Sequence, residues 1–489
     1  MKIKTGDDYR ESLKSLNAEI YVLGEKIKDV TTHPMTRPHV NCAAETYNLV
    51  GDPQSSHDPQ YEEYLTAESH LTGKKISIFT HIHHSADDLV KKVKMMRAMG
   101  RKTGSCFQRC VGHDGINSLY SITFEIDEKL GTDYHQRLKN YLEYVQEENI
   151  MIAGAMTDAK GDRGLRPHQQ PDPDMFVRVS ERRKDGIVVR GCKMHITGAV
   201  NSHDVLAMPT VGMGEEEKDF AVAFSIPVDT KGITLVFGRQ TNDARRLENG
   251  EIDDGNFKYG PVGGEAAIIF EDVFVPWDRV FLCGEHEFSG MFVDRFATAH
   301  RQNYGGCKAG VCDVMTGAAA LVAEYQGTDK ASHIRDKVTE MIHLTETLHC
   351  CSLACSYEGK KTPSGAFMAD RMLANIVKMN TTRHVYEVAR LLHDIAGGYI
   401  ATLPAEVDFQ HPELKDMLEK YYKSKEGVPT EYRVRIGRLI EIMSGGTTLT
   451  ESMHGAGSPQ AQRLMILRRG DIELKKQFAR ALAGIPEKK

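Results

Sequence analysis

Three cysteines and one histidine in two short segments carry the strongest chemical signal in this sequence. Cys106 and Cys110 stand in the run GSCFQRC, and if that run is helical, the four-residue spacing places both thiols on one face. Taken alone, such a pair is more typical of two structural cysteines, because thiols are among the most buried side chains. The pair becomes informative only together with a second segment.

The second segment, HRQNYGGCK, predicts a helix with an unusual face. His300, Tyr304, Cys307 and Lys308 fall at i, i+4, i+7 and i+8, which is one continuous stripe of a helix. Such a stripe is normally apolar and faces the core, but here it consists of an imidazole, a phenol, a thiol and an ammonium. The pattern favours a functional surface, and the two adjacent glycines permit close approach of a bulky group.

Three thiolates and one imidazole are ligands that either structural zinc or an iron–sulfur cluster accepts. Spacing alone does not choose between these metals. Structural zinc usually takes closely spaced ligand pairs, whereas these ligands come from two distant regions, which is more typical of an active site. A rival group of thiols, Cys350, Cys351 and Cys355, has little polar company and is typical of core packing.

Two polar segments and two glutamates complete the set of candidates. The segment 156–163, MTDAKGDR, and the run HIT at 195–197 offer hydrogen-bond donors to a flat heterocycle or its diphosphate. Glu265 precedes an apolar run and Glu451 lies in TESMHGAGSP, so both are acid–base candidates, although each alone is more typical of a surface carboxylate. No GxGxxG follows a predicted strand and no GxxxxGK[ST] occurs, which argues against Rossmann and P-loop enzymes.

The overall composition excludes several classes of protein. The 489 residues include 62 Lys and Arg against 68 Asp and Glu with no long run of one sign, so a nucleic-acid surface is not expected. No window reaches the roughly 18 to 20 consecutive apolar residues of a membrane span, and the polar N-terminal segment lacks the apolar stretch of a secretory signal. We therefore expect a cytoplasmic protein with reduced cysteines and no membrane partner.

The first 150 residues, which must position Cys106 and Cys110, look mainly helical. Ser85 followed by Asp88 is typical of a capping box, and an apolar stripe follows it. A second helix is predicted over 132–147 from apolar residues at i, i+3, i+4 and i+7.

A change of periodicity near residue 174 predicts a central antiparallel β domain. Two β-branched runs flank the turn Lys184-Asp185-Gly186, which is a hairpin signal. Further strands are predicted at 221–228, 232–237 and 266–275. Long helical patterns then continue to the end and predict a bundle. The predicted domains are residues 1–150 (helical), 151–284 (β) and 285–489 (helical bundle).

Five motifs together give the sequence a specific resemblance. The segments CFQRCVG, AMTDAKGDRG, HITGAVNSH, HRQNYGGCKAG and TESMHGAGSPQAQR occur in the order found in the 4-hydroxybutyryl-CoA dehydratase family, and the likeness covers essentially the whole chain. That family belongs to the wider 4-hydroxyphenylacetate 3-hydroxylase family. The resemblance implies an α+β, acyl-CoA dehydrogenase-like fold, which agrees with the predicted order of helical domain, β domain and helical bundle.

The resemblance also implies cofactors and an assembly. It implies a 4Fe-4S cluster held by Cys106, Cys110, His300 and Cys307, with FAD beside it, in a homotetramer whose subunits pair to complete the flavin sites. The implied flavin contacts are Met156, Thr157, Asp158, Ala159, Lys160, Gly161, Asp162, Arg163, His195, Ile196, Thr197, Ile395, Ala396, Gly397 and Gly398.

The implied reaction is radical dehydration of 4-hydroxybutyryl-CoA to crotonyl-CoA, together with isomerisation of vinylacetyl-CoA. The C3 proton of this thioester is not acidified, so acid–base catalysis of the usual ~10²- to 10⁴-fold does not suffice, and the resemblance implies a transient one-electron oxidation by FAD. His300 is expected to ligate iron and, when its imidazole leaves the metal, to act as the C2 base. Tyr304 and Glu451 are expected to protonate or position the leaving hydroxyl, Lys308 and Glu265 to set the local electrostatics, and Thr197 to hydrogen-bond the flavin.

Two alternatives remain open from the sequence. One is a flavin-dependent hydroxylase or acyl-CoA dehydrogenase-type oxidoreductase in which the cysteines are incidental. The other is a zinc-stapled scaffold that binds partners and catalyses nothing.

Overall fold

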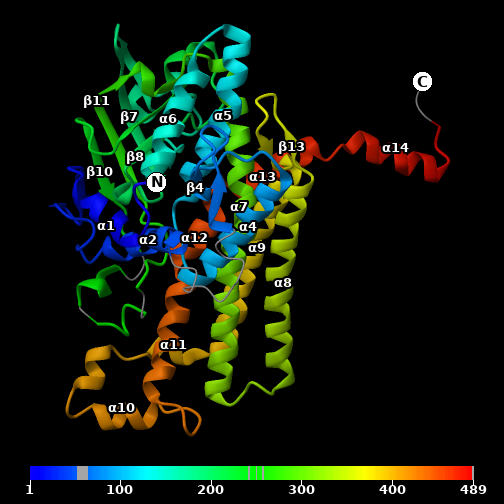
Figure 1. The fold of residues 1–489 in the computed structure, drawn as a ribbon. Coiled ribbons are helices and arrows are strands. Elements are labelled where there is room, and N and C mark those ends of the chain that lie inside the picture. Colours follow the sequence, from blue (N-terminus) through cyan, green and yellow to red (C-terminus); the bar gives the residue numbers. More distant parts are fainter. Residues whose placement is uncertain (52–63, 241–242, 249, 256–257, 487–489) are drawn as a thin grey trace.

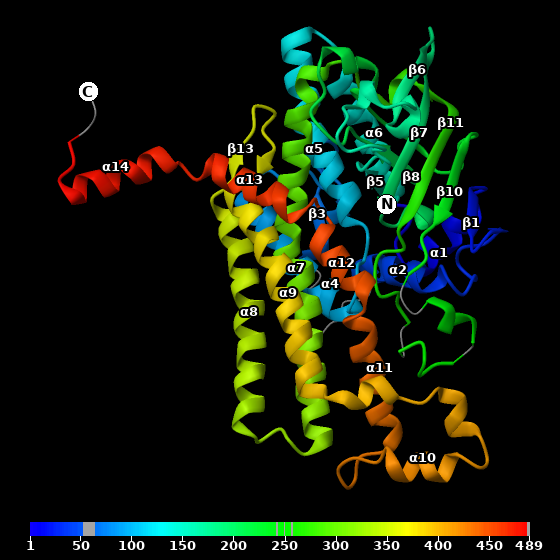
Figure 2. The same cartoon turned by 180° about the vertical axis from the view of Figure 1, so that it is seen from behind.

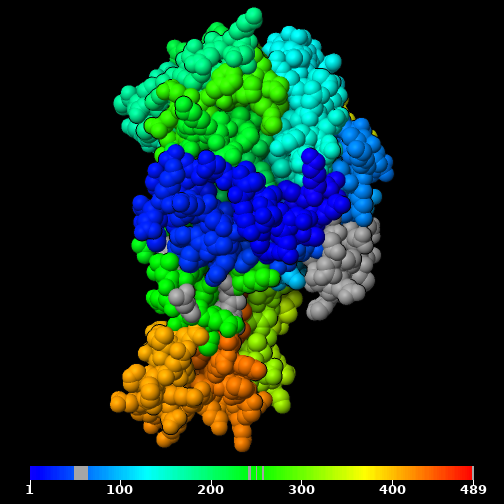
Figure 3. Space-filling model, turned by 60° about the vertical axis from the view of Figure 1, so that its left-hand side comes forward, coloured from blue at the N-terminus to red at the C-terminus, as the bar shows by residue number. Residues whose placement is uncertain are grey.

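A β domain, a group of N-terminal helices and a long helical bundle pack side by side (Figures 1 and 2). The computed structural model describes residues 1–51, 64–240, 243–248, 250–255 and 258–486. In the space-filling view, α1 (Gly6–Lys14) and α2 (Arg37–Gly51) lie across one face, below the β domain and above the lobe that contains α10 (Lys415–Tyr421) (Figure 3).

The β domain contains two large sheets, of six and of four strands, whose orders are β2-β1-β10-β11-β7-β6 and β12-β9-β8-β5. The predicted hairpin is confirmed, because Arg182 of β6 pairs with Ile187 of β7 across the 184–186 turn. The other predicted strands are also present. The first sheet comprises β1 (Glu19–Val22), β2 (Glu25–Ile27), β6 (Arg178–Arg182), β7 (Gly186–Ile196), β10 (Ile233–Phe237) and β11 (Ala266–Pro276). The second comprises β5 (Ile152–Ala155), β8 (Asp204–Ala207), β9 (Val222–Pro227) and β12 (Val280–Cys283).

The expectation of a purely antiparallel β domain is wrong. Strand β1 pairs in parallel with β10, and β5 pairs in parallel with β8. Residues 19–27 of the N-terminal part therefore belong to the large sheet, although the first 150 residues look mainly helical in sequence. Strands of three or four residues are too short to show a period of two, so only their partners in space reveal them. The division at residues 150 and 284 stays a prediction.

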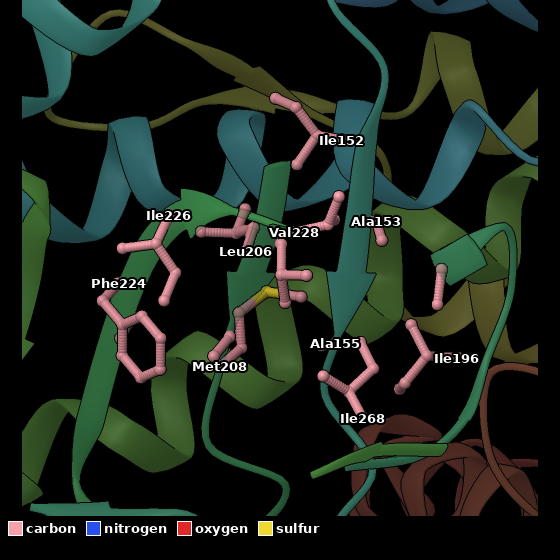
Figure 4. Packing of buried hydrophobic residues seen from close by; sticks show 14 of the residues in the cluster. Ile152, Ala153, Ala155, Ile196, Leu206, Met208, Phe224, Ile226, Val228 and Ile268 are labelled. Atoms are coloured by element: carbon pink, nitrogen blue, oxygen red, sulfur yellow. The ribbon is translucent and has the colours of Figure 1, made fainter. Parts of the chain in front are cut away.

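Apolar side chains from both sheets fill the space between them (Figure 4). Leu206 and Phe224 of the small sheet and Ile268 of the large sheet are fully buried. Each large aliphatic or aromatic side chain buried in this way contributes about 1.5–3 kcal/mol. The result is a rigid support for the loops that follow β5 and β7.

The predicted N-terminal helices are confirmed. Helix α4 (Ala86–Thr103) begins with the predicted capping box, in which the Ser85 hydroxyl accepts a hydrogen bond from Asp88 N at 3.2 Å. Helix α5 (Cys110–Leu130) follows, and α6 (Tyr134–Glu148) buries its predicted apolar stripe.

The bundle is built on one very long helix, α7 (His286–Gln326). Around it lie α8 (Ser332–Tyr357), α9 (Arg371–Ala396), α11 (Thr430–Met443), α12 (Gly446–His454) and α13 (Pro459–Arg469). By length and composition α7 is apolar enough to cross a membrane, although the count of consecutive apolar residues in the sequence predicted no such span. However, 61% of its most apolar window is buried inside the fold, as in a core helix.

Glycines allow α7 to approach α4 and α8 closely. A Cβ on Gly306 would lie 2.5 Å from Val93 O, and one on Gly305 would lie 2.2 Å from the Ser352 side chain. On α4, a Cβ on Gly100 would lie 2.4 Å from Cys307 O. The glycine pair therefore admits neighbouring helices rather than a bulky ligand, and this contact fixes Cys307 against α4.

Candidate active site

Cys106 and Cys110 are brought together by a turn and not by a helix face. Cys110 is the first residue of α5, and Cys106 lies in the preceding non-helical segment. Between them Gln108 has a φ of 73°, which breaks the helical path, and its side-chain amide donates to His39 O at 2.9 Å. The run is therefore not helical, and the condition for a shared helix face is not met, although both thiols point into the same region.

Cys307 of α7 faces the same region. Cys110 and Cys307 pack in one apolar cluster with Phe107. Burial raises the pKa of the Cys106 and Cys110 thiols well above the usual range, and the nearby sulfur of Cys307 contributes to the rise of both pKa values. For Cys307, burial raises the pKa to about 11. Three enclosed thiols from two distant segments thus converge.

His300 is held by a buried carboxylate. Its Nδ1 donates to Asp114 Oδ2 at 2.8 Å, and the other Asp114 oxygen accepts from Lys92 Nζ at 2.7 Å. Burial alone would raise the pKa of Asp114, but Lys92 and His300 lower it to about 2. A histidine that ligates a metal typically donates its second ring N–H to a carboxylate in this way. This arrangement leaves His300 Nε2 as the ligating or basic nitrogen.

The donor set suits a cluster better than a single ion. Within the described part of the chain, no group of three or more His, Cys, Asp and Glu side chains gathers closely enough to hold one metal ion. The ligands of a 4Fe-4S cluster bind different iron atoms and therefore stand farther apart than the ligands of one zinc ion. Three thiols and a carboxylate-backed imidazole fit such a cluster. The assignment of these four ligands stays a prediction.

A charged group built around Glu451 lies beside the thiols. Lys308 Nζ forms an ion pair with Glu451 Oε2, and Tyr304 Oη donates to Glu451 Oε1 at 3.3 Å. Burial raises the pKa of Tyr304 well above its usual range, so its phenol keeps its proton. Burial opposes ionisation of Glu451, but Lys308 outweighs it and lowers the pKa. The structure thus brings together a phenol, a carboxylate and an ammonium that the sequence singled out separately.

Lys378 of α9 completes this group and was missed in the sequence. It is fully buried, its Nζ lies 3.8 Å from the centre of the Tyr304 ring, and it donates to Ser452 O at 2.6 Å. Burial lowers its pKa to about 7. The sequence does contain one signal for Lys378, because this charged residue lies within the apolar helical stripe that contains Ala374 and Val385. Asp114, Lys92 and Gln240 were missed as well, since nothing local distinguishes them.

Glu265 and Thr197 lie at the β-domain side of the site. Thr197 Oγ1 donates to Glu265 Oε1 at 3.4 Å, and Gln240 Nε2 donates to Glu265 Oε2 at 2.8 Å. A Cβ added to Gly263 would lie 2.2 Å from the Thr197 side chain and 3.3 Å from the sulfur of Cys106. Burial, reinforced by the negative charge of Glu451, raises the pKa of Glu265 to about 7.

The loop 156–163 lies against β7, beside residues 195–197. Met194 N donates to Thr157 O at 2.7 Å, and Ala159 N donates to Cys192 O at 3.2 Å. The Asp158 carboxylate is committed to Lys193, 2.7 Å away, and both side chains are buried, so this carboxylate is not available to a ligand. Gly161, Asp162, Arg163 and His195 are exposed.

Residues 395–398 lie at the other end of the bundle (Figures 1 and 2). Gln326, the last residue of α7, donates to Ala396 O at 2.8 Å. Since 19 residues of α7 separate Gln326 from Cys307, this segment is about 28 Å from the thiols along the helix. It does not meet Thr197 within one chain.

Two family models cover nearly the whole sequence. The description "4-hydroxyphenylacetate 3-hydroxylase N terminal" matches residues 5–282, and "4-hydroxyphenylacetate 3-hydroxylase C terminal" matches residues 289–484. The chain belongs to the 4-hydroxyphenylacetate 3-hydroxylase family. Within this family it is 51% identical to the 4-hydroxybutyryl-CoA dehydratase/vinylacetyl-CoA-Δ-isomerase of Clostridium aminobutyricum, over 99% of this chain and 100% of the relative.

Solved structures of the 4-hydroxyphenylacetate 3-hydroxylase family confirm the fold. An oxygen-tolerant archaeal 4-hydroxybutyryl-CoA dehydratase from N. maritimus has a TM-score of 0.96 and 50% identity, covering 100% of this chain and 96% of that one. The oxygenase component of 4-hydroxyphenylacetate 3-monooxygenase in complex with FAD has a TM-score of 0.81 and 26% identity, covering 98% of each chain. A glutaryl-coenzyme A dehydrogenase, 11% identical with a TM-score of 0.52, shares the fold alone over 93% of this chain and 96% of that one. The α+β, acyl-CoA dehydrogenase-like prediction is confirmed, and the chain is an enzyme, so the scaffold alternative is wrong.

Proposed function

We propose that this enzyme dehydrates 4-hydroxybutyryl-CoA to crotonyl-CoA and isomerises vinylacetyl-CoA, using FAD and a 4Fe-4S cluster. The observation that carries the proposal is the convergence of Cys106, Cys110 and Cys307 with a carboxylate-backed His300 beside the Glu451 group. The 51% identical relative, which is named for both activities, supports the same reaction. Cys106, Cys110, His300 and Cys307 would hold the cluster.

When bound, FAD would supply one-electron chemistry and the cluster would supply a Lewis-acidic iron for the departing hydroxyl. The chain itself supplies the base. With its Nε2 released from iron, His300 removes the C2 proton, which the thioester acidifies, because Asp114 fixes Nδ1 as the protonated nitrogen. Lys92 keeps Asp114 ionised for this purpose.

The Glu451 group delivers a proton to the hydroxyl on C4. Tyr304 is protonated and hydrogen-bonded to Glu451, while Lys308 remains charged beside that carboxylate. Lys378 faces the Tyr304 ring and limits the negative charge that this group accumulates. Glu265 and Thr197 lie toward the β domain, where Thr197 would hydrogen-bond the flavin.

Two observations support a flavin site completed by a second copy of the chain. The segment 395–398 is remote from Thr197 within one chain, so it reaches a flavin at Thr197 only from a neighbour. Helix α14 (Ile472–Ala483) projects from the body with an exposed apolar side, where Phe478 and Leu482 are 59% and 92% exposed (Figures 1 and 2). We therefore propose a cytoplasmic homotetramer with a CoA-thioester substrate and no nucleic-acid or membrane partner.

An anaerobic experiment tests this function. Purified protein is analysed for flavin, iron and acid-labile sulfide, and is then given 4-hydroxybutyryl-CoA while crotonyl-CoA formation is followed. We expect iron and sulfide near four per chain, as in one 4Fe-4S cluster, and dehydration in the same preparation. Flavin without iron, with hydroxylation of a phenol instead, would support the hydroxylase alternative and contradict the proposal.

A further inference from the structure

A cavity lies close to the thiols and is not used by the chemistry above. It has a volume of about 480 Å³, within the range of small-molecule sites. Its walls come from the C-terminal end of α4, one side of α7, one side of α11 and the loop before β11. Figures 1 and 2 show α11 beside the lower half of α7, below α4.

The rim of this cavity is cationic. Arg101, Lys102, Lys258 and Arg435 line it, and no carboxylate is present among the described lining residues. Three of these cations meet carboxylates outside the lining: Arg101 with Asp313 at 2.6 Å, Lys258 with Glu45 at 3.1 Å, and Arg435 with Glu431 at 2.6 Å and Glu251 at 3.5 Å. A guanidinium has five N–H donors, so an arginine held in this way still binds a second anion.

Aromatic and aliphatic side chains form an apolar floor of the cavity. Tyr259, Tyr325 and Tyr432 contribute phenol rings, and Ile436 and Leu439 contribute aliphatic surface. On α11 these lining residues fall at i, i+3, i+4 and i+7 from Tyr432, so they form one face of the helix. A flat heterocycle with several phosphates is the ligand that an apolar aromatic floor with a cationic rim recognises.

The cavity also lies within reach of the proposed active site. Thr103 lines it and stands three residues before Cys106, a distance of at most about 11 Å along the chain. An acyl-thioester whose reacting carbons lie beside Cys106 can extend a pantetheine arm over this distance. Among adenosine diphosphate groups, the one in CoA carries an additional 3′-phosphate that matches a rim of four cations.

We propose that this cavity binds the 3′-phosphoadenosine diphosphate group of the CoA thioester; this rests on the proposed function. FAD also contains an adenosine diphosphate group, so the experiment must separate the two sources. The probes are CoA and 3′-dephospho-CoA, titrated by calorimetry into the anaerobic holoenzyme. The variant is Lys258→Gln with Arg435→Gln. The matched control is Arg390→Gln, which removes an arginine held by an exposed i,i+3 pair with Glu387 on α9.

We expect wild-type protein to bind CoA more tightly than 3′-dephospho-CoA. The double variant should weaken CoA binding at least about tenfold and lose that preference, while its flavin content stays that of wild type. The control should change neither. Loss of FAD with unchanged CoA affinity would assign the cavity to the flavin and overturn the proposal, and so would a variant that changes neither ligand.

The reaction itself is tested separately from the cavity. If wild type turns over 4-hydroxybutyryl-CoA but the double variant binds CoA as well as wild type, the inference fails while the proposed function stands. If wild type neither binds CoA nor turns over the thioester, the proposed function fails and the inference fails with it.

Discussion

Two buried lysine–carboxylate pairs in this enzyme have the same distance and different surroundings. Lys92 and Asp114 lie 2.7 Å apart between α4 and α5, and Lys193 and Asp158 lie 2.7 Å apart in the β domain. Lys193 also donates to two main-chain carbonyls, and Asp158 also accepts from Val177 N, so that pair only ties loops to strands.

The second oxygen of Asp114 instead binds His300 and Asn303. The Lys193–Asp158 pair is therefore bound to main-chain groups, whereas the Lys92–Asp114 pair places its carboxylate against an imidazole beside three thiols. Both pairs are buried, so burial of a charge pair is not enough to identify a functional site. A functional site is indicated when the pair binds a further side chain that keeps an atom available for a ligand, as His300 keeps Nε2.

The largest effect should come from the ligand set that Asp114 supports. Cys307→Ala should lose both the iron and the dehydration activity, because one of four cluster ligands is removed. Iron analysis and the anaerobic assay measure this. Cys355→Ala is the control, since Cys355 is buried on α8 and donates to Asp370 O, away from the proposed ligands. A Cys307→Ala protein with full iron and activity would show that the ligand assignment is wrong.

Asp114→Asn compared with Asp158→Asn tests the comparison directly. Both changes leave a buried lysine without its carboxylate and should cost about 3–5 kcal/mol of stability. Only Asp114→Asn should also lower iron affinity or activity, by about 10- to 100-fold, because it removes the carboxylate behind His300. Chemical denaturation and iron retention during dialysis separate the two effects. Equal iron loss in both variants would contradict the role assigned to Asp114.

Lys378→Met extends the comparison to a third buried lysine, for which the described residues provide no ion pair with a carboxylate. Removing a buried charge of this kind should leave stability nearly unchanged, whereas Lys193→Met leaves Asp158 unpaired and should destabilise the fold. Because Lys378 orients Tyr304 and the Ser452 backbone, we expect Lys378→Met to lower kcat by roughly tenfold, with little change in KM. A variant that is unstable but catalytically normal would make Lys378 purely structural.

The smallest effect concerns the pH dependence of stability. The pKa of Glu265 is about 7 in the folded protein and near its ordinary value when unfolded, so the folded state binds the proton more tightly. Wild type should lose stability as pH rises from about 4.5 to 7, by at most about 3 kcal/mol. Glu265→Gln should remove this loss.

Thermal unfolding at pH 5 and pH 8 provides the measurement. The stability of the variant minus that of wild type should be larger at pH 8 than at pH 5. Any cost of the altered hydrogen bonds to Thr197 and Gln240 is common to both pH values and cancels in this comparison. An unchanged difference between the two pH values would mean that Glu265 does not titrate in this range.

Local pattern determined much of this protein from sequence alone. The capping box at Ser85, the hairpin at 184–186 and the imidazole–phenol–thiol stripe of α7 depend on neighbours within a few residues, so their spacing reveals them. The five motifs also indicated the family before any geometry was known.

Which distant groups meet depends on the packing of the folded chain. This packing placed residues 19–27 beside β10, put Asp114 behind His300 and Lys378 over Tyr304, and separated residues 395–398 from Thr197. The physical reason is that these contacts arise when packing removes water from side chains far apart in the chain. Burial and the charges that become neighbours then set the pKa values of the site, and no local spacing encodes either.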